Sequence, residues 1–268
     1  MLLLYLPTLI WLVKAWMHNE YYGHGFLIPV ISAFFIWRLR DRLEIHNSSP
    51  YWILFFVLGL AMYIIGFVRG MQFLSALSLP IVLAALALHF YGQNSLKVLA
   101  FPIVFLLFMI PPPFLSSMGW ELQRISTQGS TLLSKATPLE VTATGTTLMM
   151  NGNPFNVGLP CSGMHSLISL LALSAVLAYV LTGPWIKKAI LFVSTVPIAI
   201  AANSMRIVSL LLVANYYGVE AADTDAPFHS ISSVLLFLVA LLALILLSRV
   251  LGLSLTPITG KESADEVS

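Results

Sequence analysis

The chain has 268 residues, of which 59% are hydrophobic and only 9% are charged, and its formal net charge is +2. This composition and the mean hydropathy of +0.92 are typical of a polytopic membrane protein, and they exclude an ordinary soluble domain. The small, dispersed positive charge gives no reason to expect a nucleic-acid partner. The single cysteine excludes intramolecular disulfides and four-thiolate metal sites, and we expect neither a metal nor a cofactor.

Apolar segments in chain order predict an all-α polytopic membrane helix bundle of about eight transmembrane helices. They cover roughly 2–17, 25–40, 51–69, 72–91, 96–115, 162–182, 185–214 and 229–250. The first lacks the basic start and the small-residue cleavage site of a signal peptide, so we expect it to be retained. We predict one transmembrane catalytic domain over 1–256 and a disordered cytoplasmic tail over 257–268.

The basic residues of the short loops predict the orientation of this bundle. In an eight-span arrangement one side receives Arg38, Arg40, Arg42, Lys97, Lys187, Lys188 and Arg249. The other side receives Glu20, Glu121, Glu140, Glu220, Asp223 and Asp225. Because cytoplasmic loops are enriched in Lys and Arg, the basic side is predicted to be cytoplasmic, with both termini on it.

The segment 116–160 is then an extracytoplasmic insertion. In its first half, 120–136, one helical face carries Leu122, Ile125, Gly129, Leu132 and Ala136, and the other carries Glu121, Arg124, Gln128 and Lys135. This pattern is typical of an amphipathic helix at the membrane interface. The second half is rich in β-formers around an Asn151-Gly152-Asn153-Pro154 turn, which predicts a β-hairpin or three-stranded flap, with an irregular loop as the alternative.

Three chemically unusual residues are predicted to reach the same outer depth. Cys161 opens the span at 162–182, and His229 opens the last span. Arg206 lies nine residues before Asn215, about 13–14 Å below the outer end of its helix, and its long side chain can extend outward. A guanidinium inside a span is costly and usually marks a functional interior.

A thiol, an imidazole and a guanidinium together suggest cysteine acyl-transfer chemistry. His229 could take the thiol proton and later protonate the leaving amine, while Arg206 could stabilise the thiolate or an oxyanion. Less specific interpretations stay open for each residue taken alone. Cys161 could be a buried structural thiol, Arg206 could bind a helix carbonyl, and His229 could cap a helix.

Two further polar residues are candidates for supporting roles. His24 lies at the outer start of the second span, where it could line a substrate entrance or bond at the interface. Asn203 lies one helical turn below Arg206 and could orient it, although ordinary helix–helix bonding is equally plausible.

The order of motifs resembles the exosortase/archaeosortase family. The resemblance rests on Cys161-Ser162-Gly163 opening a span, Asn203-Ser204-Met205-Arg206 in the next, and His229-Ser230 opening the last. The early stretch from Tyr22 to Pro29 is also similar to the opening region of that family. At His165, relatives often have Arg, which leaves the role of this residue open.

The resemblance implies an integral-membrane cysteine transpeptidase or protease in the cell membrane, with an active site on the extracytoplasmic side. It would cleave exported proteins at a C-terminal sorting signal made of a short motif, a hydrophobic helix and a basic tail. Cys161 would form a thioester acyl-enzyme with Arg206 and His229 as catalytic partners, supported by His24, Ser162, Gly163, His165 and Asn203. The acceptor nucleophile is unknown. The alternative is a multi-pass transporter with Arg206 as an intramembrane anion site.

Overall fold

The computed structural model describes residues 2–19, 21–43, 48–156, 162–223 and 225–255. The chain forms two compact units, Met1–Gly119 and Trp120–Ser268. The predicted tail at 257–268 and the nucleophile candidate Cys161 lie outside the described residues. The prediction of one domain over 1–256 stays a prediction.

The first unit is built on a helical hairpin. α3 (Tyr51–Val68) packs along α4 (Gln72–Phe105), and the short η3 (Leu106–Met109) follows α4. Gly92 interrupts α4 with a φ of 78°, so α4 consists of two helices that turn back on each other. Ala84 and Ala87 before the break pack against Leu99 and Ile103 after it. The break falls between the apolar segments predicted at 72–91 and 96–115, and glycine adopts its positive φ at low cost.

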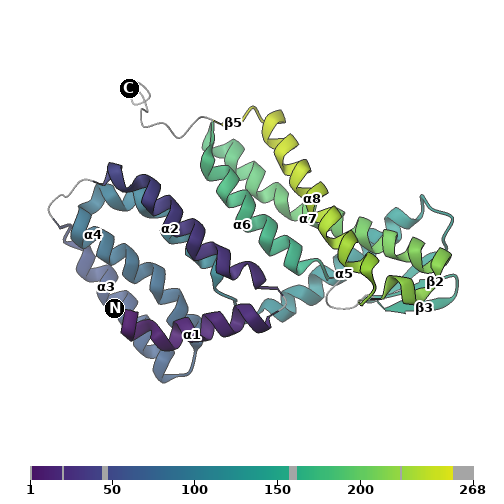
Figure 1. Cartoon of the computed structure of the whole chain (residues 1–268), viewed down its shortest axis with the longest axis horizontal. Helices are drawn as coiled ribbons and strands as arrows, with labels where there is room; N and C mark the ends of the chain where they lie inside the picture. The colour runs from purple at the N-terminus through teal and green to yellow at the C-terminus, as the bar shows by residue number, and fades with distance from the viewer. Residues whose placement is uncertain (1, 20, 44–47, 157–161, 224, 256–268) are drawn as a thin grey trace. The chain divides into compact units, whose positions relative to one another are not determined.

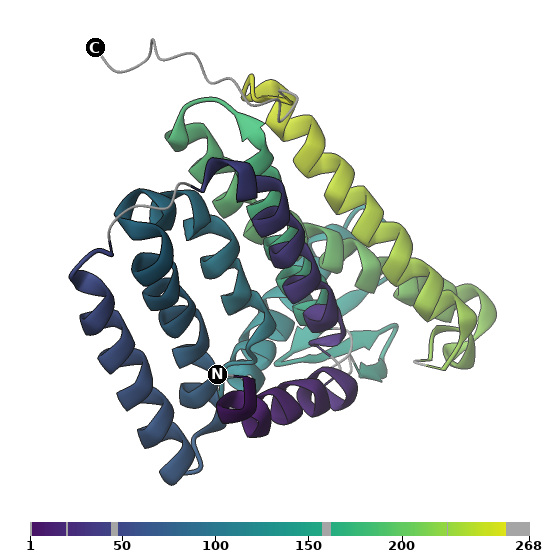
Figure 2. The same ribbon diagram turned by 60° about the vertical axis from the view of Figure 1, so that its left-hand side comes forward.

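Two more helices complete the first unit (Figures 1 and 2). α2 (Leu27–Leu39) lies beside α4, between the short helices η1 (Gly23–Phe26) and η2 (Arg40–Arg42). α1 (Leu2–His18) instead runs across the end of the unit where α3 turns into α4. Its Tyr5 Oη lies 2.7 Å from Ser78 Oγ near the start of α4, and its Trp16 Nε1 donates to Met109 O at 2.8 Å. That 2–17 crosses the membrane stays a prediction.

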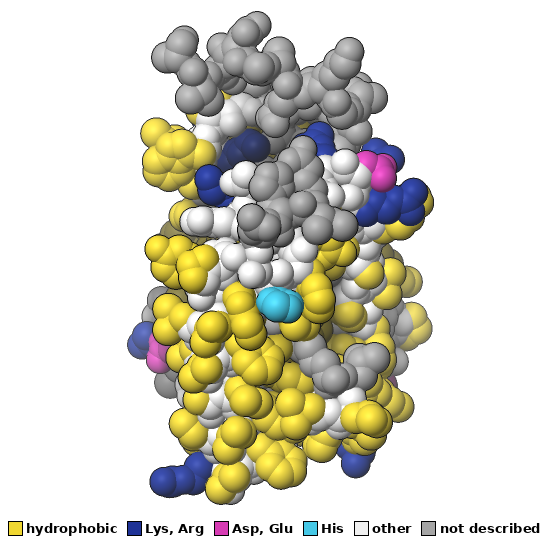
Figure 3. Space-filling view, turned by 90° about the vertical axis from the view of Figure 1, so that its left-hand side faces the viewer, with side chains coloured by type: hydrophobic (Ala, Val, Ile, Leu, Met, Phe, Trp, Pro, Cys, Tyr) yellow, Lys and Arg dark blue, Asp and Glu magenta, His cyan; other side chains and the backbone are white. Residues whose placement is uncertain are grey.

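Among the residues that the structure describes, four helical segments are long and apolar enough to cross a membrane. They are Tyr51–Val68, Gln72–Met109 (which contains the Gly92 break), Trp185–Tyr217 and Pro227–Val250, and the apolar helix Met164–Val180 is shorter. Exposed hydrophobic side chains cover most of the face of the first unit on the side of α3 (Figure 3). A helical membrane protein therefore fits, because lipid tolerates an apolar surface that water does not. The number of eight spanning helices stays a prediction.

The second unit is centred on α7 (Trp185–Tyr217), which packs against both α6 (Met164–Val180) and α8 (Pro227–Val250). The short η5 (Val219–Ala222) joins α7 to α8. At the other end of α8, β5 (Ser254–Leu255) pairs with β4 (Leu181–Thr182), which follows α6. This small antiparallel pair ties the ends of α6 and α8 together.

A three-stranded antiparallel sheet occupies the segment for which the sequence predicted a hairpin or flap. Its order is β1 (Val141–Thr144), β2 (Thr147–Met150) and β3 (Asn153–Asn156). Asn151 and Gly152 join the last two strands with φ angles of 49° and 83°, as a two-residue turn between twisted strands requires. Leu148 and Met150 pack in one cluster with Ile207, Leu210 and Leu211, so the sheet covers α7 directly after Arg206.

The predicted apolar face of the amphipathic segment 120–136 is only partly buried in α5 (Leu115–Ser134), where Leu122 is buried. Ile125 and Leu132 are exposed, whereas small and polar residues are buried, namely Gln123, Ser126, Thr127, Ser130 and Ser134. Ser204 of α7 donates to Ser126 O at 3.2 Å, and a Cβ on Gly129 would lie 2.5 Å from Ser204 Oγ. Small residues let helices approach closely inside a membrane, where apolar side chains gain nothing by leaving the lipid.

Candidate active site

Arg206 and His229 form a buried pair within the second unit. Arg206 lies in the C-terminal half of α7, and His229 lies in the first turn of α8. The Arg206 Nη2 atom is 3.0 Å from His229 Nε2 and 3.4 Å from His229 Nδ1. Only 6% of Arg206 and 8% of His229 are exposed. Two side chains from different helices, 23 positions apart in the sequence, are therefore in contact.

The chemistry of this contact constrains the imidazole. A guanidinium only donates hydrogen bonds, and an imidazole can accept one only through an unprotonated nitrogen. Nη2 lies at a similar distance from both ring nitrogens, which places it over the face of the imidazole and away from the in-plane lone pairs. The contact therefore suits a neutral His229, because a protonated ring would place a second positive charge against the guanidinium.

Local helix structure holds both residues in register. Pro227 occupies the first turn of α8, where its missing N–H costs nothing and its fixed φ favours helix initiation. The hydroxyls of Ser232 and Ser233 donate to His229 O at 3.0 and 2.8 Å. The hydroxyl of Ser209 likewise donates to Arg206 O at 2.7 Å. These bonds satisfy the serine hydroxyls inside the helices and keep them off lipid.

The start of α6 approaches the same part of α7. Gly163 precedes the helix with a φ of 79°, and a Cβ on it would lie 2.6 Å from the Asn203 Cγ atom. Both the conformation and the contact therefore require glycine. Ser162 is fully buried, and its Oγ accepts a hydrogen bond from Met164 N at 3.3 Å. Asn203 is itself buried one turn below Arg206, so its side chain holds the α6 start against α7.

A pocket of about 420 Å³ lies between α6 and α8, with Arg206 and His229 in its wall. Gly163, His165, Ser166 and Ser169 line it from α6 and the residues just before it; Ser233, Val234 and Phe237 line it from α8. The pocket thus has a polar end beside the Arg206–His229 pair and an apolar end beside Phe237. It is large enough for a peptide segment to enter.

The structure relates the other predicted residues to this site in different ways. His165 is exposed and lines the pocket, and Ser162 and Asn203 are buried beside it. Cys161 lies outside the described residues; Gly163, two positions later in the sequence, lines the pocket. His24 belongs to the first unit, where its ring lies 5.3 Å from the ring of Tyr22.

Sequence reasoning missed the serines of the pocket wall and Phe237. A signal was present, because Ser169 follows His165 by four residues and Ser233 follows His229 by four residues. Residues at this spacing lie on one face of a helix. Within the described ranges, no group of three or more His, Cys, Asp and Glu side chains could hold a metal ion.

Comparison with known proteins gives one match, to the family described as Transmembrane exosortase (Exosortase_EpsH), and it covers residues 16–246. No curated protein and no solved structure matches the chain. The matched region includes Cys161, Arg206, His229 and the pocket between α6 and α8, and it extends over most of the sequence. The chain therefore belongs to the transmembrane exosortase family.

Proposed function

We propose that this protein is a membrane-embedded cysteine transpeptidase or peptidase that cleaves the C-terminal sorting signal of exported proteins. One observation carries the proposal. The buried guanidinium of Arg206 lies 3.0 Å from the buried imidazole of His229, in the wall of the pocket between α6 and α8. Family membership supports a peptide-processing role for this pair over the alternative of an anion-transport site.

In the proposed reaction Cys161 is the nucleophile. His229 takes the proton from the Cys161 sulfur, and the thiolate attacks the carbonyl carbon of the scissile bond. The C–N bond then breaks, the proton passes from His229 to the leaving amine, and the acyl group remains on sulfur as a thioester. An acceptor amine or water resolves the thioester and releases the thiol.

The Arg206–His229 contact suggests how Arg206 takes part. When His229 accepts the thiol proton, a second positive charge forms beside the Arg206 guanidinium, whose Nη2 lies 3.0 Å from Nε2, and this repulsion favours a turn of Arg206 away from the ring. The released guanidinium is then available to the thiolate or to the oxyanion of the tetrahedral intermediate. Proton transfer to His229 and the turn of Arg206 toward the anion would thus occur together.

The pocket suggests how the substrate enters. Its apolar end beside Val234 and Phe237 suits a hydrophobic segment delivered along the bilayer, and its serines can bond a backbone unwound near the cleavage site. We propose that the site faces the extracytoplasmic side of the cell membrane, with the C-terminus cytoplasmic, in agreement with the distribution of Lys and Arg. His24 is proposed to lie at the substrate entrance, and His165 to contact the substrate.

The test uses cells that lack the native enzyme and export proteins with such a signal. Cys161→Ala and Cys161→Ser should leave the protein inserted and abolish processing, while the exposed Ser117→Ala should process normally. The wild type should also yield a substrate fragment linked to Cys161 by a hydroxylamine-sensitive thioester. Normal processing by Cys161→Ala would refute the proposal.

A further inference from the structure

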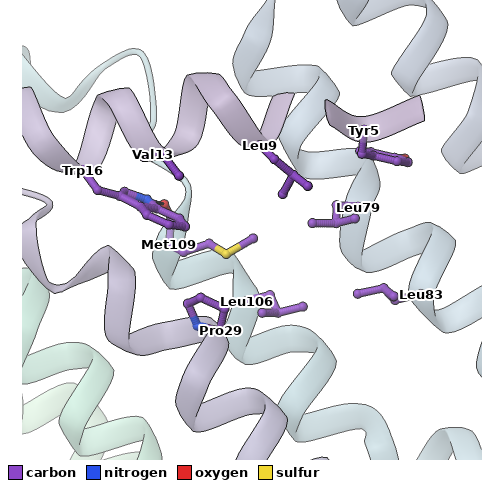
Figure 4. Close-up of a pocket in the computed structure, with 9 residues that line it drawn as sticks. All are labelled: Tyr5, Leu9, Val13, Trp16, Pro29, Leu79, Leu83, Leu106 and Met109. Atoms are coloured by element: carbon purple, nitrogen blue, oxygen red, sulfur yellow. Dashed lines mark hydrogen bonds between the residues drawn. The ribbon is translucent and has the colours of Figure 1, made fainter. Parts of the chain in front are cut away.

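A second pocket, of about 620 Å³, lies in the first unit beneath α1 (Figure 4). Leu9 and Val13 form its roof, Pro29 of α2 forms one side, and Leu83, Leu106 and Met109 form its floor. Tyr5 and Trp16 close its two ends on α1. The proposed reaction uses no part of this pocket.

Both ends of α1 are held in place, so the pocket is a built feature of the unit. At one end Tyr5 bonds to Ser78, and its ring lies 4.7 Å from the ring of Tyr63. At the other end Trp16 donates to Met109 O at 2.8 Å. A Cβ on Gly25 would lie 2.3 Å from Trp16 Cδ1, so the indole is pressed against the η1 backbone. These contacts fix both ends of α1 on the rest of the unit.

The lining favours a hydrocarbon occupant over water. The polar atoms of Tyr5 and Trp16 are both engaged by the bonds that hold α1. The other lining groups named above are aliphatic or thioether side chains, which give water no hydrogen-bond partner.

The size and surroundings of the pocket narrow the occupant further. A transmembrane helix is about 10–12 Å wide with its side chains, too large for 620 Å³ over any useful length. An alkyl chain fits. Ile10 and Val13 of α1 and Val30 of α2 are exposed apolar residues, so the surface beside the pocket is itself suited to lipid. Lys14, the only Lys or Arg of α1, is exposed near the Trp16 end.

We propose that this pocket binds one acyl chain of a membrane phospholipid, with the chain beneath α1 and the phosphate near Lys14. The roof and floor supply apolar contact, and the ammonium supplies a partner for the anionic headgroup at one end. A bound chain would fill the pocket and so stabilise the first unit. The proposal does not depend on the proposed peptidase activity.

The test uses the full-length protein in phospholipid vesicles that contain phosphatidylcholine with a diazirine in one acyl chain. After photolysis, peptide mass spectrometry should find lipid adducts on Leu106 and Met109, which are buried in the protein apart from this pocket. Leu83→Trp fills the pocket and should lose those adducts, and Val13→Phe, from the opposite wall, should do the same. Adducts on the exposed Leu54 of α3 should persist in both variants and serve as the control.

The absence of adducts on Leu106 and Met109 in the wild type, or their persistence in both filled variants, would overturn the proposal. A parallel sample with diazirine-labelled palmitate distinguishes the source of the chain. If palmitate labels these residues and the phospholipid does not, the occupant is a free fatty acid, and the proposal of a phospholipid chain is wrong. Lys14→Gln should reduce the phospholipid adducts on Met109 and leave those on Leu54 unchanged.

Discussion

The backbone of Gly163 lies against the side chain of Asn203 so closely that a methyl group on Gly163 would come 2.6 Å from the Asn203 Cγ atom. This contact joins the start of α6 to α7 one turn below Arg206. It connects the segment that follows Cys161 with the helix that carries the guanidinium. The site is therefore sensitive to the volume of a side chain that takes no part in the chemistry.

Gly163→Ala should destabilise the protein by about 1–3 kcal/mol, because alanine tolerates neither the φ of 79° nor the contact with Asn203. Denaturant unfolding in detergent measures the loss. Gly145→Ala is a matched control, since Gly145 has a φ of 66° and nothing within 4 Å of its Cβ position.

The double variant Gly163→Ala/Asn203→Ala removes the close contact but keeps the unfavourable φ at position 163. Its free energy of unfolding should therefore lie between those of Gly163→Ala and the wild type. If Gly163→Ala lowered the free energy of unfolding no more than Gly145→Ala does, the contact between Gly163 and Asn203 would not contribute to stability.

Arg206→Lys should reduce substrate processing by roughly 10²–10³-fold, the usual cost of losing one donor to an oxyanion. Lysine keeps the charge, but it loses the planar fork that can turn from His229 to an anion. Pulse-chase conversion of an exported substrate measures the rate. Arg249→Lys, at the exposed end of α8, should process normally. Full activity of Arg206→Lys would leave Arg206 with a structural role only.

His229 can be tested separately for its structural and its chemical role. His229→Leu leaves the buried Arg206 Nη2 without this acceptor and should lower stability by about 1–3 kcal/mol. His229→Gln offers a carbonyl oxygen to the same donor, so it should lose much less stability. Neither side chain transfers a proton at neutral pH, so both variants should stop processing. Processing by a stable His229→Gln would exclude proton transfer through His229.

The orientation can be measured with reporter fusions. Fusions after Arg42 and Lys188 should read cytoplasmic, and a fusion at Asp223 should read extracytoplasmic, as the positive-inside rule predicts. A cytoplasmic Asp223 would place His229 on the wrong side for exported substrates. A fusion before Leu2 tests α1. The sequence predicts a cytoplasmic N-terminus, whereas Tyr5 bonds near the start of α4 and Trp16 just after its end, and α4 turns back on itself between these points. An extracytoplasmic reading there would remove α1 from the spanning helices.

The sequence by itself determined the helical membrane class and the position of most helices. Long apolar runs predict helices in any context because lipid requires internally bonded backbone, and α3, α7 and α8 follow those runs closely. The turns at Gly92 and at Asn151-Gly152 were also predictable, since few residues adopt positive φ. At these positions the local sequence was sufficient to predict the secondary structure.

Only the tertiary structure decided which faces and side chains meet. The packed face of α5 is formed by Ser126 and its small neighbours while Ile125 faces outward, because hydropathy cannot tell lipid contact from protein contact. The sequence placed Arg206 and His229 at a similar depth, but helix rotation and the turn through η5 bring Nη2 and Nε2 to 3.0 Å. The crossing of α1 over α4, and the pocket beneath it, likewise depend on contacts between residues far apart in the chain, which no local pattern encodes.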